Sequence, residues 1–301
     1  MTDTRPEPAS PGGHRRAIAV ALLVTVLWSS SWVLVRVGLD DAGLPPVTFA
    51  GLRYTAAAVV LWVAIAVRRV PLRSPGWSRR ELAGLALLGL VFYTVTQGAQ
   101  FVAIAHQPAA TTSLVLALTP LAVGLTGRAL LGERPTSGQF AGSVLVAAGA
   151  AAYFAGSLGA TTLGITAALI ALVANTAGGL LGRHVNRAAR RPVLVVTAVS
   201  MSVGAGVLDV VGLLREGLPR LSPMALLIIA WLAVVNTALA FTLWNLALRR
   251  LTAIESAGIN NLMLIQIAGL AWVFLGEPLD PAGVLGVGVV SAGVYLTQRR
   301  P

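Results

Sequence analysis

The sequence predicts an all-α polytopic membrane protein with ten transmembrane helices, arranged as two inverted five-helix repeats with both termini in the cytoplasm. Three observations predict this fold class: an apolar composition, ten apolar segments long enough to cross a bilayer, and a motif pattern that occurs twice. The chain is 56% hydrophobic and 11% charged, with a mean hydropathy of +0.81, whereas a soluble domain carries about 25% charged residues. A soluble fold cannot bury so much apolar surface, but a bilayer solvates it.

A spanning helix needs roughly 20 mainly apolar residues, and charged or turn-forming residues mark its ends. These criteria divide the chain into segments at 17–38, 47–67, 80–104, 109–131, 137–156, 163–183, 193–214, 223–248, 253–275 and 281–297. Residues 1–16 are mostly polar, without the layout of a cleavable signal, and predict a disordered cytoplasmic tail. Residues 299–301 are expected to form the cytoplasmic C-terminus.

The basic residues indicate the orientation of the segments. All 22 are arginines, and the formal charge is +11. They lie in short clusters between apolar runs, without the basic surface and aromatic platform of a nucleic-acid-binding protein, so no nucleic-acid partner is expected. With a cytoplasmic N-terminus the clusters fall in alternate loops, as the positive-inside rule requires. Only three fall at outside ends: Arg36, Arg215 and Arg220.

The internal repeat shows the domain organisation. The stretch Leu-Gly-Glu-Arg-Pro at 131–135 is echoed by Leu-Gly-Glu-Pro at 275–278, and the same register pairs Gly142 with Gly286 and Gly149 with Gly293. We therefore predict a first repeat at 17–156 and a second at 157–298. Because five helices is an odd number, the second repeat enters the membrane in the opposite orientation. Inverted repeats are typical of secondary transporters, which alternate access to a site between the halves.

The ordered and duplicated motifs resemble the drug/metabolite transporter superfamily, specifically its ten-helix EamA-type permeases. The motifs are Trp-Ser-Ser-Ser at 28–31, Arg-Tyr at 53–54, Thr-Pro-Leu at 119–121, and Gly-Glu at 132–133 and 276–277. The second half departs from the family pattern at 174–176 and 263–265, which leaves the substrate open. The resemblance implies efflux of a small metabolite and a central cavity lined by the first, third, fourth, sixth, eighth and ninth helices, with the fifth and tenth peripheral.

Candidate substrate-binding residues come first from the third segment. Tyr93, Gln97 and Gln100 are spaced by four and three, which places them on one helix face. The repeat register maps them onto the eighth segment, at Thr237, Phe241 and Trp244. Both halves are therefore expected to direct polar or aromatic groups toward one place. The alternative is hydrogen bonding between helices alone.

Further candidates lie on the first, sixth and ninth segments. They are aromatic, hydroxyl or amide side chains: Trp28, Ser29, Trp32, Asn175, Ser256, Asn260, Asn261 and Gln266. Aromatic faces and amides can bind a small organic solute without the full cost of burying a charge. Tryptophans near helix ends also serve as interface anchors, which is the alternative for these residues.

Ionisable groups inside the membrane are costly and face a cavity or a partner. Glu255 is either a proton-coupling carboxylate or an ion-pair partner of Arg249 and Arg250. Asp209 and Arg53 are expected to pair with each other or to extend to the membrane surface.

Two further features of the repeat have structural interpretations. Glu133 and Glu277 are expected to lock turns, held by the N-terminus of the following helix. The paired glycines at 142, 149, 286 and 293 are expected to allow close helix packing.

Enzyme motifs do not emerge from the sequence. The chain has no cysteine, and its three histidines show no spacing for a metal site, so no catalytic residue, metal or cofactor is expected. With no phosphate-binding loop, transport would be driven by a gradient or by exchange. We expect a secondary transporter of the bacterial cytoplasmic membrane that moves an amino acid or similar amphipathic solute by alternating access; the alternative is a non-transporting or enzymatic intramembrane protein. The coupling ion and oligomeric state stay open.

Overall fold

A computed structural model describes residues 11–72, 76–107, 109–132, 136–154, 160–187, 191–263, 265–266 and 281–298. Every regular element in these ranges is helical. The helices are α1 Pro11–Asp40, α2 Pro46–Val67, α3 Arg79–Leu88, η1 Gly89–Val95, α4 Thr96–His106, α5 Ala109–Leu116, α6 Thr119–Leu131, α7 Ser137–Phe154, α8 Thr162–Arg187, α9 Val193–Arg215, α10 Pro223–Trp231, η2 Leu232–Leu239, α11 Ala240–Ala247, α12 Ala253–Asn260 and α14 Pro281–Gln298.

Six helical stretches in the described part of the chain are long and apolar enough to cross a membrane. They run over Gly13–Asp40, Pro46–Val67, Arg79–His106, Thr162–Arg187, Val193–Arg215 and Pro223–Ala247. Three shorter apolar stretches cover Thr111–Gly127, Ser137–Ala152 and Gly283–Thr297. The predicted all-α polytopic class is confirmed. Glu133 and Glu277 lie outside the described residues.

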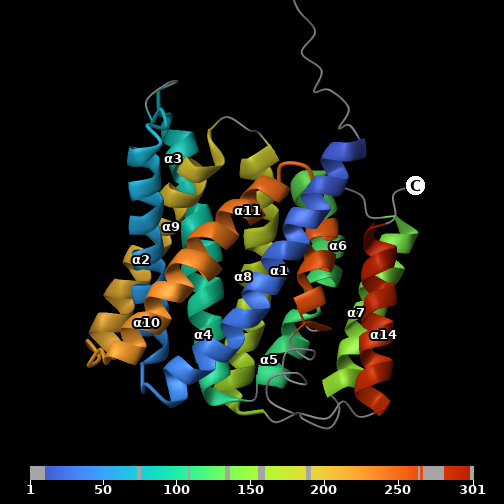
Figure 1. Ribbon diagram of the computed structural model, residues 1–301. Helices are drawn as coiled ribbons and strands as arrows, with labels where there is room; N and C mark the ends of the chain where they lie inside the picture. Colours follow the sequence, from blue (N-terminus) through green and yellow to red (C-terminus); the bar gives the residue numbers. More distant parts are fainter. Residues whose placement is uncertain are drawn as a thin grey trace, which may run out of the picture.

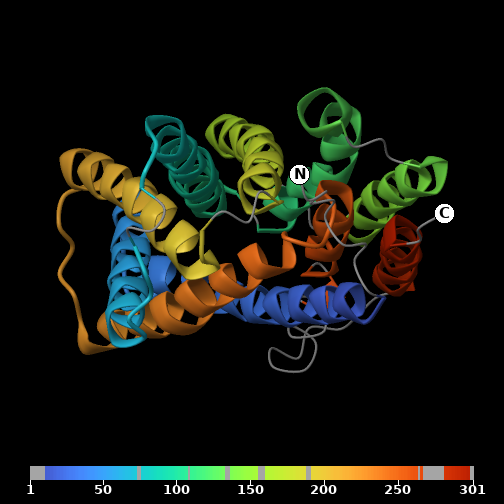
Figure 2. The same cartoon turned by 90° about the horizontal axis from the view of Figure 1, so that it is seen from above.

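The helices stand in two rows. Seen from above, α9, α4, α8 and α6 follow one another in one row, while α2, α11, α1 and α12 form the facing row (Figure 2). The helices α7 and α14 lie side by side at one end of the bundle, and α1 begins at the same face at which α14 ends (Figure 1).

Two of the long helices contain a π-helical segment at the same relative place. The stretch Arg79–His106 includes η1, and Pro223–Ala247 includes η2. In a π-helix the hydrogen bonds span five residues instead of four, and such segments are frequent at functional sites. The register that pairs Gly142 with Gly286 also pairs Val95 with Leu239, the last residues of η1 and η2.

The segment predicted at 109–131 is not one helix. The chain turns at Ala117 and Leu118, between α5 and α6, because Pro120 has no N–H with which to continue the helical ladder. The hydroxyl of Thr119 donates to the carbonyl of Leu116 at 2.6 Å. The carbonyl of Ala117 accepts from Nδ2 of Asn261, at the end of α12, at 2.8 Å. Side chains thus satisfy carbonyls beside the break, as hydrocarbon requires.

Glycines bring α7 and α14 into backbone contact. A Cβ atom on Gly142 would lie 2.6 Å from the carbonyl oxygen of Gly293, and one on Gly149 would lie 2.8 Å from that of Gly286. Since residues far along one helix meet residues early in the other, the two helices run antiparallel. These are the glycines that the sequence predicted to allow close packing.

Arg191, in the loop before α9, connects this loop to the start of α3 at one end of the bundle. Its Nε and Nη2 donate to the carboxylate of Glu81 at 2.6 and 3.0 Å, and its guanidinium lies 4.1 Å from the ring centroid of Trp77. The hydrogen bonds that Arg191 donates to Glu81 raise the pKa of Arg191 above its ordinary value. Such a bidentate pair between a guanidinium and a carboxylate is stronger than a neutral hydrogen bond, so it fixes the position of the loop relative to α3.

We predict that Gly293→Ala destabilises the protein by about 1–3 kcal/mol, because the added methyl group would overlap backbone atoms of α7. A Cβ there would lie 2.7 Å from both the carbonyl oxygen of Gly142 and the amide nitrogen of Val146. Gly288→Ala, on the same helix, is the matched control, since its Cβ would meet nothing within 4 Å. Thermal unfolding in detergent measures both; equal melting midpoints for the two variants would contradict the proposed packing.

Candidate functional site

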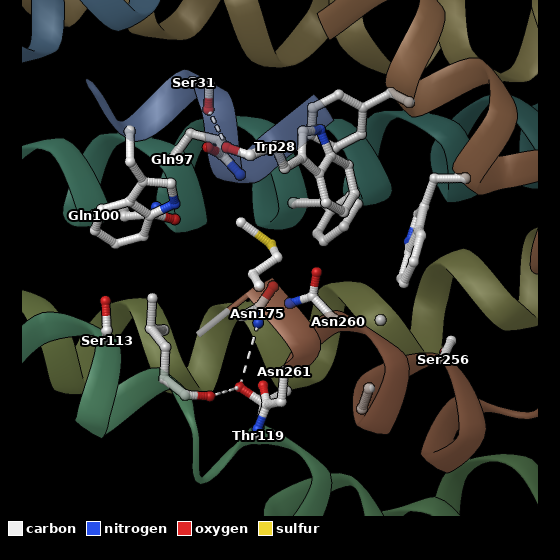
Figure 3. A pocket seen from close by; sticks show the side chains of 18 of the residues that line it. Trp28, Ser31, Gln97, Gln100, Ser113, Thr119, Asn175, Ser256, Asn260 and Asn261 are labelled. Atoms are coloured by element: carbon white, nitrogen blue, oxygen red, sulfur yellow. Dashed lines mark hydrogen bonds between the residues drawn. The ribbon is translucent and has the colours of Figure 1, made fainter. Parts of the chain in front are cut away.

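A cavity lies between the two rows of helices, and both halves of the chain contribute to its walls. We call it the central cavity. Ten residues of the predicted site line it: Trp28, Trp32, Gln97, Gln100, Asn175, Phe241, Trp244, Ser256, Asn260 and Asn261. Figure 3 shows Trp28 and Ser31 from α1 and the two glutamines from α4 on one side, facing Asn175 and Asn260. Among the residues described, none that lines the cavity comes from α7 or α14.

Four other predicted residues, Ser29, Tyr93, Thr237 and Gln266, are not among the residues that line the cavity. The Ser29 hydroxyl lies 2.7 Å from the carbonyl oxygen of Thr25 and 2.8 Å from Oε1 of Gln266. Tyr93 is fully buried, and its hydroxyl has no hydrogen-bond partner among the described residues. Thr237 is also fully buried and accepts a hydrogen bond from Arg53. These residues support the lining of the cavity from behind.

An aromatic cluster forms one wall of the central cavity. The ring of Phe241 lies 4.9 Å from Trp28, 5.0 Å from Tyr93, 5.7 Å from Phe92 and 6.0 Å from Tyr54, between centroids. Tilted and edge-to-face pairs at such distances are the favourable geometries for aromatic rings. The wall therefore offers a rigid apolar surface to a bound molecule.

Asn236 of η2 fixes α1 against this wall. Its Nδ2 donates to the carbonyl of Leu27 and, at 3.0 Å, to the hydroxyl of Ser30. In return its backbone carbonyl accepts a hydrogen bond of 3.1 Å from Nε1 of Trp28. The Trp28 indole is thereby held in place, so that its ring faces Phe241 and Trp244.

Arg53 is a cavity residue that the sequence interpretation did not select. It lies on α2, is 4% exposed, and lines the central cavity. Its predicted partner Asp209 accepts a hydrogen bond from Thr55 instead. The sequence did contain a signal that could have identified Arg53 as a site residue: it lies about two turns inside an apolar segment, where a charged residue usually has a function.

The contacts described for Glu255 do not include the expected ion pair with Arg249 or Arg250. It forms a capping box at the start of α12, where its Oε2 accepts from the Thr252 amide at 2.8 Å and its own amide donates to the Thr252 hydroxyl at 3.3 Å. His14 of α1 lies 3.6 Å from its other carboxylate oxygen. Arg249 instead donates to the backbone carbonyl of Arg191. The carboxylate is 1% exposed and is not part of the cavity lining.

A helical bundle with exposed apolar side chains outside, and with amide and hydroxyl groups among the apolar residues that line an internal cavity, is the architecture of a multi-pass membrane protein that binds a solute. The EamA-like transporter family model matches the chain twice, over residues 15–155 and 162–299. The chain belongs to this family of transporters, and it is not an enzyme. It is a multi-pass protein of the bacterial inner membrane.

Individual proteins resemble the chain along nearly its whole length. A "Probable terminal-alkyne amino-acid exporter" of Streptantibioticus cattleyicolor is 30% identical over 293 residues, covering 95% of this chain and 94% of the relative. A "Probable amino-acid metabolite efflux pump" of Escherichia coli K12 is 26% identical over 295 residues, covering 94% of each. A crystal structure with 22% identity shares the fold at a TM-score of 0.75, covering 94% of this chain and 98% of the other.

We predict that Phe241→Ala lowers the free energy of unfolding by about 3–5 kcal/mol, because removing this buried ring would leave a void at the centre of the aromatic cluster. Phe140→Ala on α7 is the control, because that ring is 40% exposed on the outer surface. The measurement is the melting midpoint of purified protein in detergent. If the two variants have the same melting midpoint, the aromatic cluster does not stabilise the fold.

Proposed function

We propose that the protein is a secondary transporter that exports a small metabolite, an amino acid or similar amphipathic solute, by alternating access. The observation that carries the proposal is the central cavity, whose amide and aromatic side chains come from both halves of an otherwise apolar bundle. Such a combination suits a solute with one polar and one apolar end. The names of the two relatives, an amino-acid exporter and an amino-acid metabolite efflux pump, favour this class of solute and the outward direction.

We assign the two halves to 17–156 and 157–298 as inverted repeats in a ten-helix topology. Several observations support the assignment. The family model matches once in each half. The π-helical segments η1 and η2 end at equivalent positions. The antiparallel contact of α7 with α14 is reciprocal, because Gly142 meets the counterpart of Gly149, and Gly149 meets the counterpart of Gly142. A two-fold axis in the membrane plane produces this pattern.

Both termini are assigned to the cytoplasm. The start of α1 and the end of α14 lie at one face in Figure 1. The same face carries the arginine-rich loops, including the fork between Arg191 and Glu81. Arginine in the short loops of one side favours the cytoplasmic orientation of that side.

The test of transport is counterflow in liposomes that contain purified protein. Vesicles loaded with an unlabelled amino acid are diluted into the same labelled amino acid, with apolar amino acids, their amines and their carboxylic acids tested in turn. We expect transient accumulation of label above the level in protein-free vesicles. Absence of counterflow across the panel, with protein that elutes as a single folded species, would reject the proposal.

Glu255 is the proposed coupling residue, and its capping role can be separated from coupling. Glu255→Gln preserves the capping box, since glutamine serves at this position as well, but it removes the titrating carboxylate. We expect this variant to retain counterflow and lose stimulation by a pH gradient. Thr252→Val removes the cap at a cost of about 1 kcal/mol while leaving the carboxylate, so its gradient response should persist. Unchanged stimulation in Glu255→Gln would exclude Glu255 from coupling.

A further inference from the structure

The central cavity contains the positive charge of Arg53, which has no counter-ion among the residues that the structure describes. Arg53 Nε donates to Oγ1 of Thr237 at 2.7 Å, and its Nη2 donates to the carbonyl of Asn236 at 3.4 Å. The Tyr54 ring centroid lies 5.4 Å from its Cζ. In the described part of the chain, no carboxylate lies within ion-pair distance of this guanidinium.

The geometry of Arg53 leaves donors available for a ligand. A guanidinium carries five N–H donors in a planar fork that matches a carboxylate. The described residues accept from Nε and Nη2 but not from Nη1. Thr237 holds the fork at its base, so the side chain is oriented before any ligand arrives. A charge in this position is costly in the membrane, and a bound anion offsets that cost.

A free acceptor is found on another wall. Oδ1 of Asn260, on α12, is buried and has no hydrogen-bond partner within the described residues. Its neighbours are already engaged, since Asn261 donates to the carbonyl of Ala117 at 2.8 Å and Asn175 to the hydroxyl of Thr119 at 3.3 Å. Figure 3 shows Asn260 pointing into the cavity opposite Trp28 and Gln97. An unpaired buried oxygen accepts favourably from an ammonium group.

We propose that the central cavity binds a zwitterionic amino acid with an apolar side chain, whose carboxylate Arg53 binds. The ammonium group donates to Oδ1 of Asn260, and the side chain rests on the aromatic wall of Trp28, Phe241 and Trp244. This assignment rests on the proposed transport function and specifies its substrate class. A simple organic cation is excluded from the site, because Arg53 repels it.

The first experiment uses the unmodified protein in the counterflow assay. Leucine is compared with isoamylamine, which lacks the carboxylate, and with 4-methylpentanoate, which lacks the ammonium group. We expect exchange of leucine at least tenfold faster than that of isoamylamine, the scale of a lost charge-assisted hydrogen bond. Exchange of isoamylamine at a rate equal to or above that of leucine overturns the Arg53 assignment while the transport function stands. If none of the panel is exchanged by folded protein, both proposals fail.

The second experiment uses Arg53→Gln and Arg53→Lys, with Arg220→Gln in the loop before α10 as the matched control. Arg220 is exposed and lies outside the cavity lining. We expect Arg53→Gln to reduce leucine exchange at least tenfold and to reduce the preference over isoamylamine, with a smaller loss in Arg53→Lys, which keeps the charge without the fork. The control should match the unmodified protein. Full leucine preference in folded Arg53→Gln overturns the assignment.

The role of Asn260 has a separate readout. Asn260→Leu removes the acceptor without adding charge, so we expect leucine exchange to fall while that of 4-methylpentanoate is maintained or rises. An equal fall for both solutes assigns Asn260 to the structure of α12 and overturns its part in binding.

Discussion

Hydrocarbon offers no hydrogen bonds, so a polar side chain inside the membrane has to find its partners within the protein. The bonds between α1 and η2 follow from this constraint. Asn236 donates to the backbone of α1 at Leu27 and accepts from the indole of Trp28 through its own carbonyl. Apolar packing alone leaves helices free to slide past each other, whereas directional bonds fix their relative position. These few hydrogen bonds therefore determine the shape of this wall of the central cavity.

The long helices could be predicted from the sequence to within a few residues. A helix that crosses the hydrocarbon core needs an apolar run of matching length, and prolines and arginines mark where that run ends. The segment predicted at 47–67, for example, is observed as Pro46–Val67. The break before Pro120 could not be predicted in the same way. A proline in an apolar run kinks or ends a helix depending on what satisfies the freed carbonyls. Here Asn261, far along the chain, is one of those partners.

The π-helical segments explain why only part of the predicted site lines the cavity. Spacings of three and four residues place side chains on one face only in a regular α-helix. Tyr93 lies in η1 whereas Gln97 lies in α4, and Thr237 lies in η2 whereas Phe241 lies in α11. The wider turn rotates one member of each pair away from the other. Gln97 and Gln100, both within α4, do line the cavity together.

The equivalent placement of η1 and η2 also has a historical consequence. A π-helical segment contains an additional residue relative to an α-helix of the same length. If the two halves descend from one duplicated gene, a single insertion before the duplication accounts for both segments. In that case each half has retained its copy, because deleting one residue would turn the helix beyond it by about 100°. In the first half that rotation would move Gln97 and Gln100 off the cavity face, so the insertion and the orientation of these two side chains would be inherited together.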